Sequence, residues 1–260
     1  MTQEERRIWL TEYLIKERAG NDGDGIPDIP ADETAQKQLL RSLMNIRPAE
    51  PVSQEFIQIQ DAYLQEELEE KGIVRLSDLS PVRKGIWLWQ GDITRLAADA
   101  IVNAANSALL GCFIPCHGCI DNAIHSAAGV QLRLECAGLM ERQGTPELTG
   151  RAKITKAYNL PCRYVLHTVG PIVRGPVTEE DRRLLAGCYR SCLELAEAYG
   201  LKSVAFCCIS TGEFHFPNEE AARIAIQTAE TYQKKHQNSP EVIFNVFKDN
   251  DLAIYRKLLG

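Results

Sequence analysis

The chain has 260 residues, 45% of them hydrophobic and 25% charged, with a formal net charge of -6 at pH 7. This composition is typical of a folded globular protein, and the length suffices for one α/β domain alone or with an extension. Because binding to nucleic acid depends on Lys and Arg neutralising phosphates, an acidic chain without basic runs argues against it.

The N-terminus and the cysteines predict a cytoplasmic protein with no membrane association. The opening segment MTQEERRIWL is charged and lacks the apolar run of a secretory signal. No stretch approaches the roughly 18 apolar residues that a membrane span requires. The nine cysteines are an odd number and several lie in apolar stretches, so we expect reduced thiols. Clustered reduced thiols then suggest metal binding or catalysis.

Residues 1–75 predict an N-terminal helical extension that carries no chemical motif. Apolar residues at helical spacing predict helices over residues 1–18, 33–46 and 53–70. We expect Ser53 to cap the third of these helices. We also expect the extension to pack on the rest of the chain, with recognition of a protein partner as the alternative.

An acidic segment, NDGDGIPDIP, separates the first two helices, and its Gly and Pro residues should end the first. The spacing of its acidic residues is similar to that of a calcium-binding loop. However, Ile26 occupies a ligand position of such a loop and Pro27 replaces its glycine. We therefore interpret the segment as a solvated linker.

Residues 76–260 alternate short apolar runs with helical segments. The expected strands lie in IWLWQGDI, ADAIVNAAN, AKITKAYNL, YVLHTVG, SVAFCCIS and EVIFNVF. One expected helix begins near residue 120, and three more lie near 179–199, 218–236 and 250–259. This alternation predicts an α/β domain whose mixed, mostly parallel sheet is covered by helices on both faces. Since ligands of such sheets bind beyond the carboxyl ends of the strands, the segments that follow strands are the candidate sites.

Two of these segments offer polar side chains. Asp92 follows the first strand, where a carboxylate can accept hydrogen bonds from an exocyclic amine or a ribose hydroxyl, although Gly-Asp also makes turns. Asn103 and Asn106 follow the second strand, where two amides can bind a sugar or can cap a tight turn.

A third segment, residues 210–217, joins a buried strand to a helix. A small turn with a glycine leaves backbone N–H groups free, and the start of the helix adds a favourable dipole for a phosphate. Phe214 or Phe216 would then close over a ribose.

The fourth segment is a cysteine-rich loop at residues 112–119, directly before a helix. Thiolates and imidazole are preferred zinc ligands, and two cysteines with one histidine leave a tetrahedral position open, as in catalytic sites. We prefer the Cys-x4-His-x-Cys set of Cys112, His117 and Cys119, because adjacent Cys116 and His117 can hardly turn toward one ion.

Three alternatives to this set stay open: a set that contains Cys116, a structural zinc to which the spare thiol supplies the fourth ligand, and a metal-free loop of thiols. Downstream, Asp121 is a natural cap for the helix and lies close enough in sequence to orient a hydroxyl at the metal. We interpret His125 and His167 as core or supporting histidines.

The ordered motifs GDIT, AIVNAANS, IDNAIHSAAG, AYNLPCRYVLHTVGP and ISTGEFHFP make residues 87–259 resemble the macrodomain family. The resemblance implies a three-layer α/β/α fold that binds ADP-ribose. It assigns Asp92 and Ile93 to the adenine, and Asn103 and Asn106 to the distal ribose. It also assigns Ile120 and Asp121 to the first substrate loop. The implied diphosphate loop consists of Ser210, Thr211, Gly212, Glu213 and Phe214.

Two departures from the general pattern, the cysteine-rich loop and the helical extension, resemble the zinc-containing microbial subgroup of macrodomains. That resemblance implies a zinc-dependent hydrolase that removes mono-ADP-ribose from acidic side chains of a protein, with Asp121 and Asn106 as catalytic residues. It further implies, as the partner, a lipoylated carrier protein modified by a sirtuin-type transferase. The alternatives are a non-catalytic ADP-ribose reader with a structural zinc and an O-acetyl-ADP-ribose deacetylase.

Overall fold

A mixed sheet forms the centre of the computed structural model, which describes residues 1–22 and 28–260. Its strand order is β2-β3-β9-β8-β5-β7-β6, and only the two edge pairings, β2 with β3 and β6 with β7, are antiparallel. The strands are β2 (Pro81–Arg83), β3 (Ile86–Gln90), β5 (Ala100–Ala104), β6 (Ala152–Lys156), β7 (Tyr164–Thr168), β8 (Ser203–Phe206) and β9 (Glu241–Val246). The central strands are buried along nearly their whole length, which explains their continuous apolar sequences.

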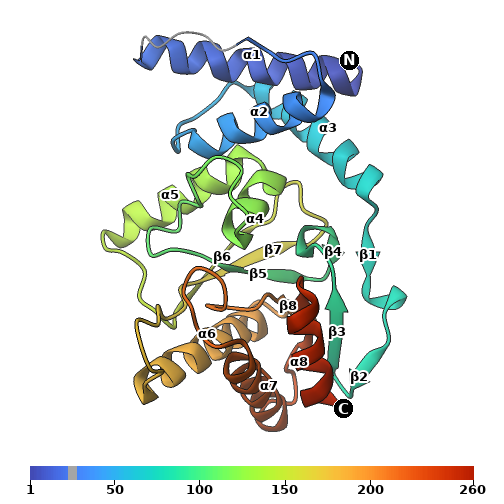
Figure 1. Cartoon of the computed structure of the whole chain (residues 1–260), viewed down its shortest axis with the longest axis vertical. Coiled ribbons are helices and arrows are strands. Elements are labelled where there is room, and N and C mark those ends of the chain that lie inside the picture. Colours follow the sequence, from blue (N-terminus) through green and yellow to red (C-terminus); the bar gives the residue numbers. More distant parts are fainter. Residues whose placement is uncertain (23–27) are drawn as a thin grey trace.

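Helices cover both faces of the sheet, which confirms the expected three-layer α/β/α fold (Figure 1). One face carries α4 (Ile120–Ala128) and α5 (Val130–Gln143), and the other carries α6 (Glu179–Ala198), α7 (Asn218–Lys235) and α8 (Asp249–Leu259). The helix expected from residue 120 is confirmed as α4, whereas the second helix, α5, was not expected, and the two are separated by Gly129. Its φ of 95° is left-handed, and a Cβ there would lie 2.6 Å from the Gln60 side chain.

The extension consists of α1 (Gln3–Asp22), α2 (Glu33–Ile46) and α3 (Gln54–Lys71). Ser53 caps α3 as expected, since its side chain accepts a hydrogen bond from the Phe56 amide. Helix α1 is longer than expected because it continues through Gly20. Half of the predicted linker, residues 23–27, lies outside the described residues.

The extension packs on α4 and α5 and has its own apolar cluster, which includes the buried side chains of Leu10, Leu40 and Phe56. Val130 at the start of α5 packs against this cluster. A short parallel pair, β1 (Val74–Arg75) with β4 (Leu96–Ala97), joins the end of the extension to the main sheet region. The packing expected for the extension is therefore observed, while the domain division at residue 75 stays a prediction.

Two further observations concern the whole described part of the chain. No helix among the described residues is long and apolar enough to cross a membrane. All nine cysteines lie in the described part of the chain, and each is an unpaired thiol.

Because strands β3, β9, β8, β5 and β7 run parallel, their carboxyl ends meet at one edge of the sheet. The segments that follow β3, β5 and β8 carry the predicted binding residues, and this topology gathers them there.

Replacing Leu40 in the extension by Ala should lower the free energy of unfolding by about 2–5 kcal/mol. Leu40 is 2% exposed and fills the apolar cluster between the helices, so the substitution leaves a cavity. Chemical denaturation measures the change. Leu148→Ala is the matched control, because Leu148 is 67% exposed and its loss should change stability by less than about 0.5 kcal/mol. Equal stabilities of the two variants would contradict the packed extension.

Candidate active site at the carboxyl edge of the sheet

A buried chain of hydrogen bonds from the sheet fixes the Asp121 carboxylate. The Asn103 amide on β5, which is fully buried, donates to Asp121 Oδ1 at 2.7 Å and lies 3.2 Å from His167 Nδ1. An acceptor role for this Nδ1 places the ring proton of His167 on Nε2, which lies 2.9 Å from Thr155 Oγ1. Burial lowers the pKa of His167 to about 3, so the imidazole is neutral. Asn103 therefore supports Asp121 and has no exposed surface of its own.

Asp121 is the second residue of α4 and is 5% exposed. Burial raises the pKa of this carboxyl to about 6, while the hydrogen bond from Asn103 and the charge of Arg133 act in the opposite direction. Asn106 Nδ2 lies 3.4 Å from Asp121 Oδ2, so both asparagine amides point to the one carboxylate. His125 Nε2 lies 3.5 Å from Asp121 Oδ1, and burial lowers the pKa of His125 well below its ordinary value.

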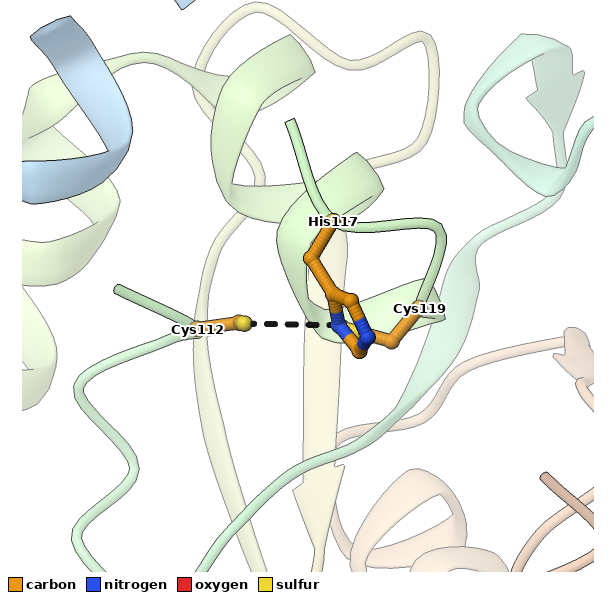
Figure 2. A group of neighbouring side chains, drawn as sticks. All are labelled: Cys112, His117 and Cys119. Atoms are coloured by element: carbon orange, nitrogen blue, oxygen red, sulfur yellow. Dashed lines mark hydrogen bonds between the residues drawn. The ribbon is translucent and has the colours of Figure 1, made fainter. Parts of the chain in front are cut away.

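The cysteine-rich loop brings the side chains of Cys112, His117 and Cys119 together (Figure 2). Their ligand atoms all lie within 4.8 Å of one another, and Cys112 Sγ is 3.6 Å from His117 Nδ1. Zinc bonds of ~2.3 Å to sulfur and ~2.05 Å to nitrogen, at a tetrahedral angle, separate the two atoms by about 3.6 Å. The Cys112–His117 pair thus has the spacing of two ligands in a tetrahedral zinc site, and Cys119 as a third ligand would leave one position for another.

Cys119 is also the N-cap of α4, because its Sγ accepts a hydrogen bond from the Asn122 amide at 3.4 Å. Burial raises the pKa of the Cys119 thiol to about 11. A thiolate at this position therefore needs a cation beside it, which is the usual coupling between metal binding and thiol deprotonation.

Cys116 lies apart from this set. Its φ of 51° is left-handed, and its Sγ lies 3.3 Å from the Gln38 carbonyl oxygen in α2. The chain therefore turns this thiol toward the extension. Of the sets considered from the sequence, the structure gathers the one without Cys116.

The loop between β8 and α7 presents unpaired backbone amides. The N–H groups of Gly212, Glu213 and Phe214 donate to no acceptor within residues 1–22 and 28–260. Left-handed φ values of 66° at Ser210 and 57° at His215 bracket these residues and turn the loop. Consecutive free amides just before a helix form a site suited to a phosphate.

Other side chains of this loop divide between core and surface. Phe216 is 1% exposed and belongs to the core, so of the two candidate aromatics only Phe214 remains available to a ribose. The Thr211 hydroxyl donates to the Cys208 carbonyl at 3.0 Å. Glu213 Oε1 lies 3.7 Å from His117 Nε2. This contact links the loop to the group formed by Cys112, His117 and Cys119, called here the cysteine set.

Asp92 caps the short 3-10 helix Ile93–Arg95 at the end of β3. Its Oδ1 accepts hydrogen bonds from the Thr94 amide at 3.0 Å and the Thr94 hydroxyl at 2.7 Å, and within the described chain its Oδ2 has no partner. Ile93 is 1% exposed, so its side chain belongs to the core.

Sequence reasoning missed two residues of this edge. Phe247 is 74% exposed directly after β9, where the Val246 carbonyl accepts from the Gly91 amide beside Asp92. An aromatic residue immediately after a strand was the available signal. Arg133 is buried in α5 and donates to the Leu110 carbonyl at 2.7 Å, and burial lowers the pKa of its guanidinium to about 10. Its signal was an arginine between two leucines, Leu132 and Leu134.

Comparisons with known proteins agree with this geometry. The Macro domain family model matches residues 102–225. The chain is 57% identical over 264 residues to a protein-ADP-ribose hydrolase of Treponema medium, covering 100% of each chain. It is 50% identical over 250 residues to a protein-ADP-ribose hydrolase of Staphylococcus aureus, covering 95% of this chain and 93% of the relative.

Among solved structures, the Trypanosoma brucei macrodomain in complex with ADP-ribose is similar with a TM-score of 0.67 and 33% sequence identity. That likeness covers 84% of this chain and 95% of the other chain. The resemblance first indicated by the ordered motifs is therefore confirmed, and the chain belongs to the macrodomain family.

Proposed function

We propose that the protein is a zinc-dependent hydrolase that removes mono-ADP-ribose from an acidic side chain of a modified protein. The observation that carries this proposal is the continuity of the cysteine set with the start of α4. Cys119, which caps the helix, is only two residues from the Asp121 carboxylate. The names of the similar proteins of Treponema medium and Staphylococcus aureus support the reaction class.

ADP-ribose would bind along the carboxyl edge of the sheet. The free amides of Gly212, Glu213 and Phe214 would accept the diphosphate, and the unpaired Asp92 Oδ2 would accept a hydrogen bond from the adenine amine. The exposed ring of Phe247 beside this end of the sheet suits stacking on the adenine. These contacts would place the distal ribose near Asn106 and Asp121, so binding energy is used for orientation.

The cysteine set fits zinc by donor chemistry and by spacing. Cys112, His117 and Cys119 would hold the ion, and zinc supplies Lewis acidity to an oxygen atom of the distal ribose or to the water that attacks it. The Glu213 carboxylate would accept a hydrogen bond from His117 Nε2 and fix the orientation of the imidazole.

Hydrolysis then needs one water and one proton acceptor. Asp121, held in place by the amides of Asn103 and Asn106, would accept a proton from the attacking water. The bond between the anomeric carbon and the ester oxygen breaks, and the side-chain carboxylate leaves with the bonding electrons. The products are ADP-ribose and the restored acidic side chain.

The target protein belongs to the same proposal. A lipoylated carrier protein modified by a sirtuin-type transferase is the substrate that the subgroup resemblance favours. The reader and the O-acetyl-ADP-ribose deacetylase are the competing functions, and both are outcomes of the tests below.

Replacing Cys119 by Ser should abolish release of ADP-ribose from an aspartate- or glutamate-modified protein while free ADP-ribose still binds. Ser preserves the helix cap but removes the thiolate ligand. The measurements are single-turnover release and calorimetric binding. Cys116→Ser is the matched control, because its hydroxyl can still donate to the Gln38 carbonyl, and it should retain activity.

Treating the wild-type protein with a chelator should have the same effect as Cys119→Ser. Undiminished turnover by a verified zinc-free preparation contradicts the metal-dependent mechanism. Binding of the modified protein with no release supports the reader instead, and release of acetate from O-acetyl-ADP-ribose with no action on modified protein supports the deacetylase.

Replacing Asp121 by Asn should lower kcat by about 100- to 10,000-fold, because an amide cannot accept the proton. KM should change much less, since the diphosphate and adenine contacts remain. Steady-state kinetics on the modified protein separates the two parameters. Asp78→Asn, on the exposed 3-10 helix Leu76–Asp78, should leave both unchanged. A normal kcat in Asp121→Asn removes Asp121 from the mechanism.

A further inference from the structure

One face of α2 carries polar side chains that are turned toward the cysteine-rich loop. The side chains of Arg41 and Asn45 are four residues apart and so lie on one side of the helix, and the backbone carbonyl of Gln38 also contacts the loop. The apolar residues Leu40 and Leu43 face the cluster inside the extension. Helix α2 therefore packs into the extension with one side and contacts the loop with the other.

Arg41 makes the central contacts of this face. Its Nη2 and Nε donate to Asn122 Oδ1 at 2.7 and 3.2 Å, and the same Nη2 donates to the His117 carbonyl at 3.3 Å. A planar guanidinium can hold two acceptors in a fixed arrangement, which a lysine cannot do. The guanidinium thus fixes the backbone of one member of the cysteine set.

Asn122, the main partner of Arg41, spans the loop. Its side-chain Nδ2 donates to the Ile114 carbonyl at 3.0 Å, and its backbone N–H donates to Cys119 Sγ at 3.4 Å. Asn122 is fully buried, so its orientation depends on these hydrogen bonds. Through the Asn122 side chain, Arg41 acts on the middle of the loop, and the backbone of the same residue contacts Cys119, a second member of the set.

Asn45 and Gln38 hold the tip of the loop. Asn45 Oδ1 accepts from the Cys116 amide at 2.9 Å, while its Nδ2 donates to Ser126 Oγ in α4 at 2.9 Å. The Gln38 carbonyl accepts from the Cys116 thiol. Cys116 has a left-handed φ of 51°, a conformation that persists only where surrounding contacts impose it.

Arg133 connects the end of α2 to the other side of the loop. It donates to the carbonyls of Met44, at 3.1 Å, and of Arg47, and its guanidinium lies 4.3 Å from the centre of the Phe113 ring. The last carbonyls of a helix carry a partial negative charge, which suits a buried cation. The loop is therefore held between two arginines, and both contact α2 or belong to it.

We propose that α2 is a template that holds residues 112–119 in ligand geometry before metal arrives, with Arg41 as its main positioning residue. This inference rests on the zinc site of the proposed function. A loop that is already ordered loses less conformational entropy when it binds an ion, so the template raises metal affinity. The extension is then part of the metal site although it supplies no ligand.

The test compares Arg41→Met with Arg6→Met by titration of the metal-free proteins with cobalt(II), which reports thiolate ligands by its visible and near-ultraviolet bands. Arg41→Met should bind cobalt at least about 10-fold more weakly than wild type. Arg6 is a partly buried arginine of the same extension whose partners, Glu66 and Gln3, lie within it, so Arg6→Met should match wild type. Arg41→Lys, which retains the charge but not the fork, should be intermediate and covers the case in which Arg41→Met fails to fold.

Hydrogen exchange of the backbone amides of residues 113, 114 and 116–118 in the metal-free proteins gives a second readout. Exchange should be faster in Arg41→Met than in wild type or Arg6→Met, at an unchanged melting temperature of the remaining core. Wild-type cobalt affinity together with wild-type exchange in Arg41→Met overturns the template. A wild-type protein that takes up no cobalt contradicts the proposed zinc site, and the exchange data still decide whether Arg41 orders the loop.

Discussion

The hydrogen bond between the Asn103 amide and the Asp121 carboxylate is the interaction on which the rest of the site depends. It joins the end of β5 to the first turn of α4 in a region without exposed surface, where electrostatic interactions are strong and an unpaired group is costly. Behind it, the neutral His167 and Thr155 complete the chain and fix the orientation of the amide. Once the first turn of α4 is fixed, Cys119 at its cap is fixed as well. The same hydrogen bond therefore helps to position both the Asp121 carboxylate and the Cys119 thiol.

The alternation of apolar and helical segments predicted the order of the main strands and helices, because these elements bury continuous apolar surface. The spacing of Cys112, His117 and Cys119 predicted the set that the structure gathers, because a loop of that length can return to one point. The separate helix α5 beyond Gly129 was not predicted, and the contact at its start, between the Val130 amide and Gln60, joins residues that are 70 apart in the chain. Such long-range contacts leave no local pattern.

Long-range contacts also explain the other differences between the predicted and the observed site. Asn103 resembled a surface ligand because it follows a strand, but its side chain is fully buried and its Nδ2 donates to Asp121 inside the protein. Phe216 and Phe214 are two residues apart in a turn, and only the packed structure separates the core ring from the free one. Arg133 contacts carbonyls that are 86 and 89 residues distant in sequence, so its role was visible only as an arginine out of place.

The contacts between α2 and the cysteine-rich loop bear on whether the loop can function without the N-terminal extension. The Macro domain match begins at residue 102, well after α2 has ended. A graft of residues 112–119 onto a macrodomain without such a helix would transfer the three donor side chains but not Arg41 or Asn45, which hold the backbone between them. Loop and helix would therefore have to be inherited or transplanted as a single unit, and neither alone reproduces the site.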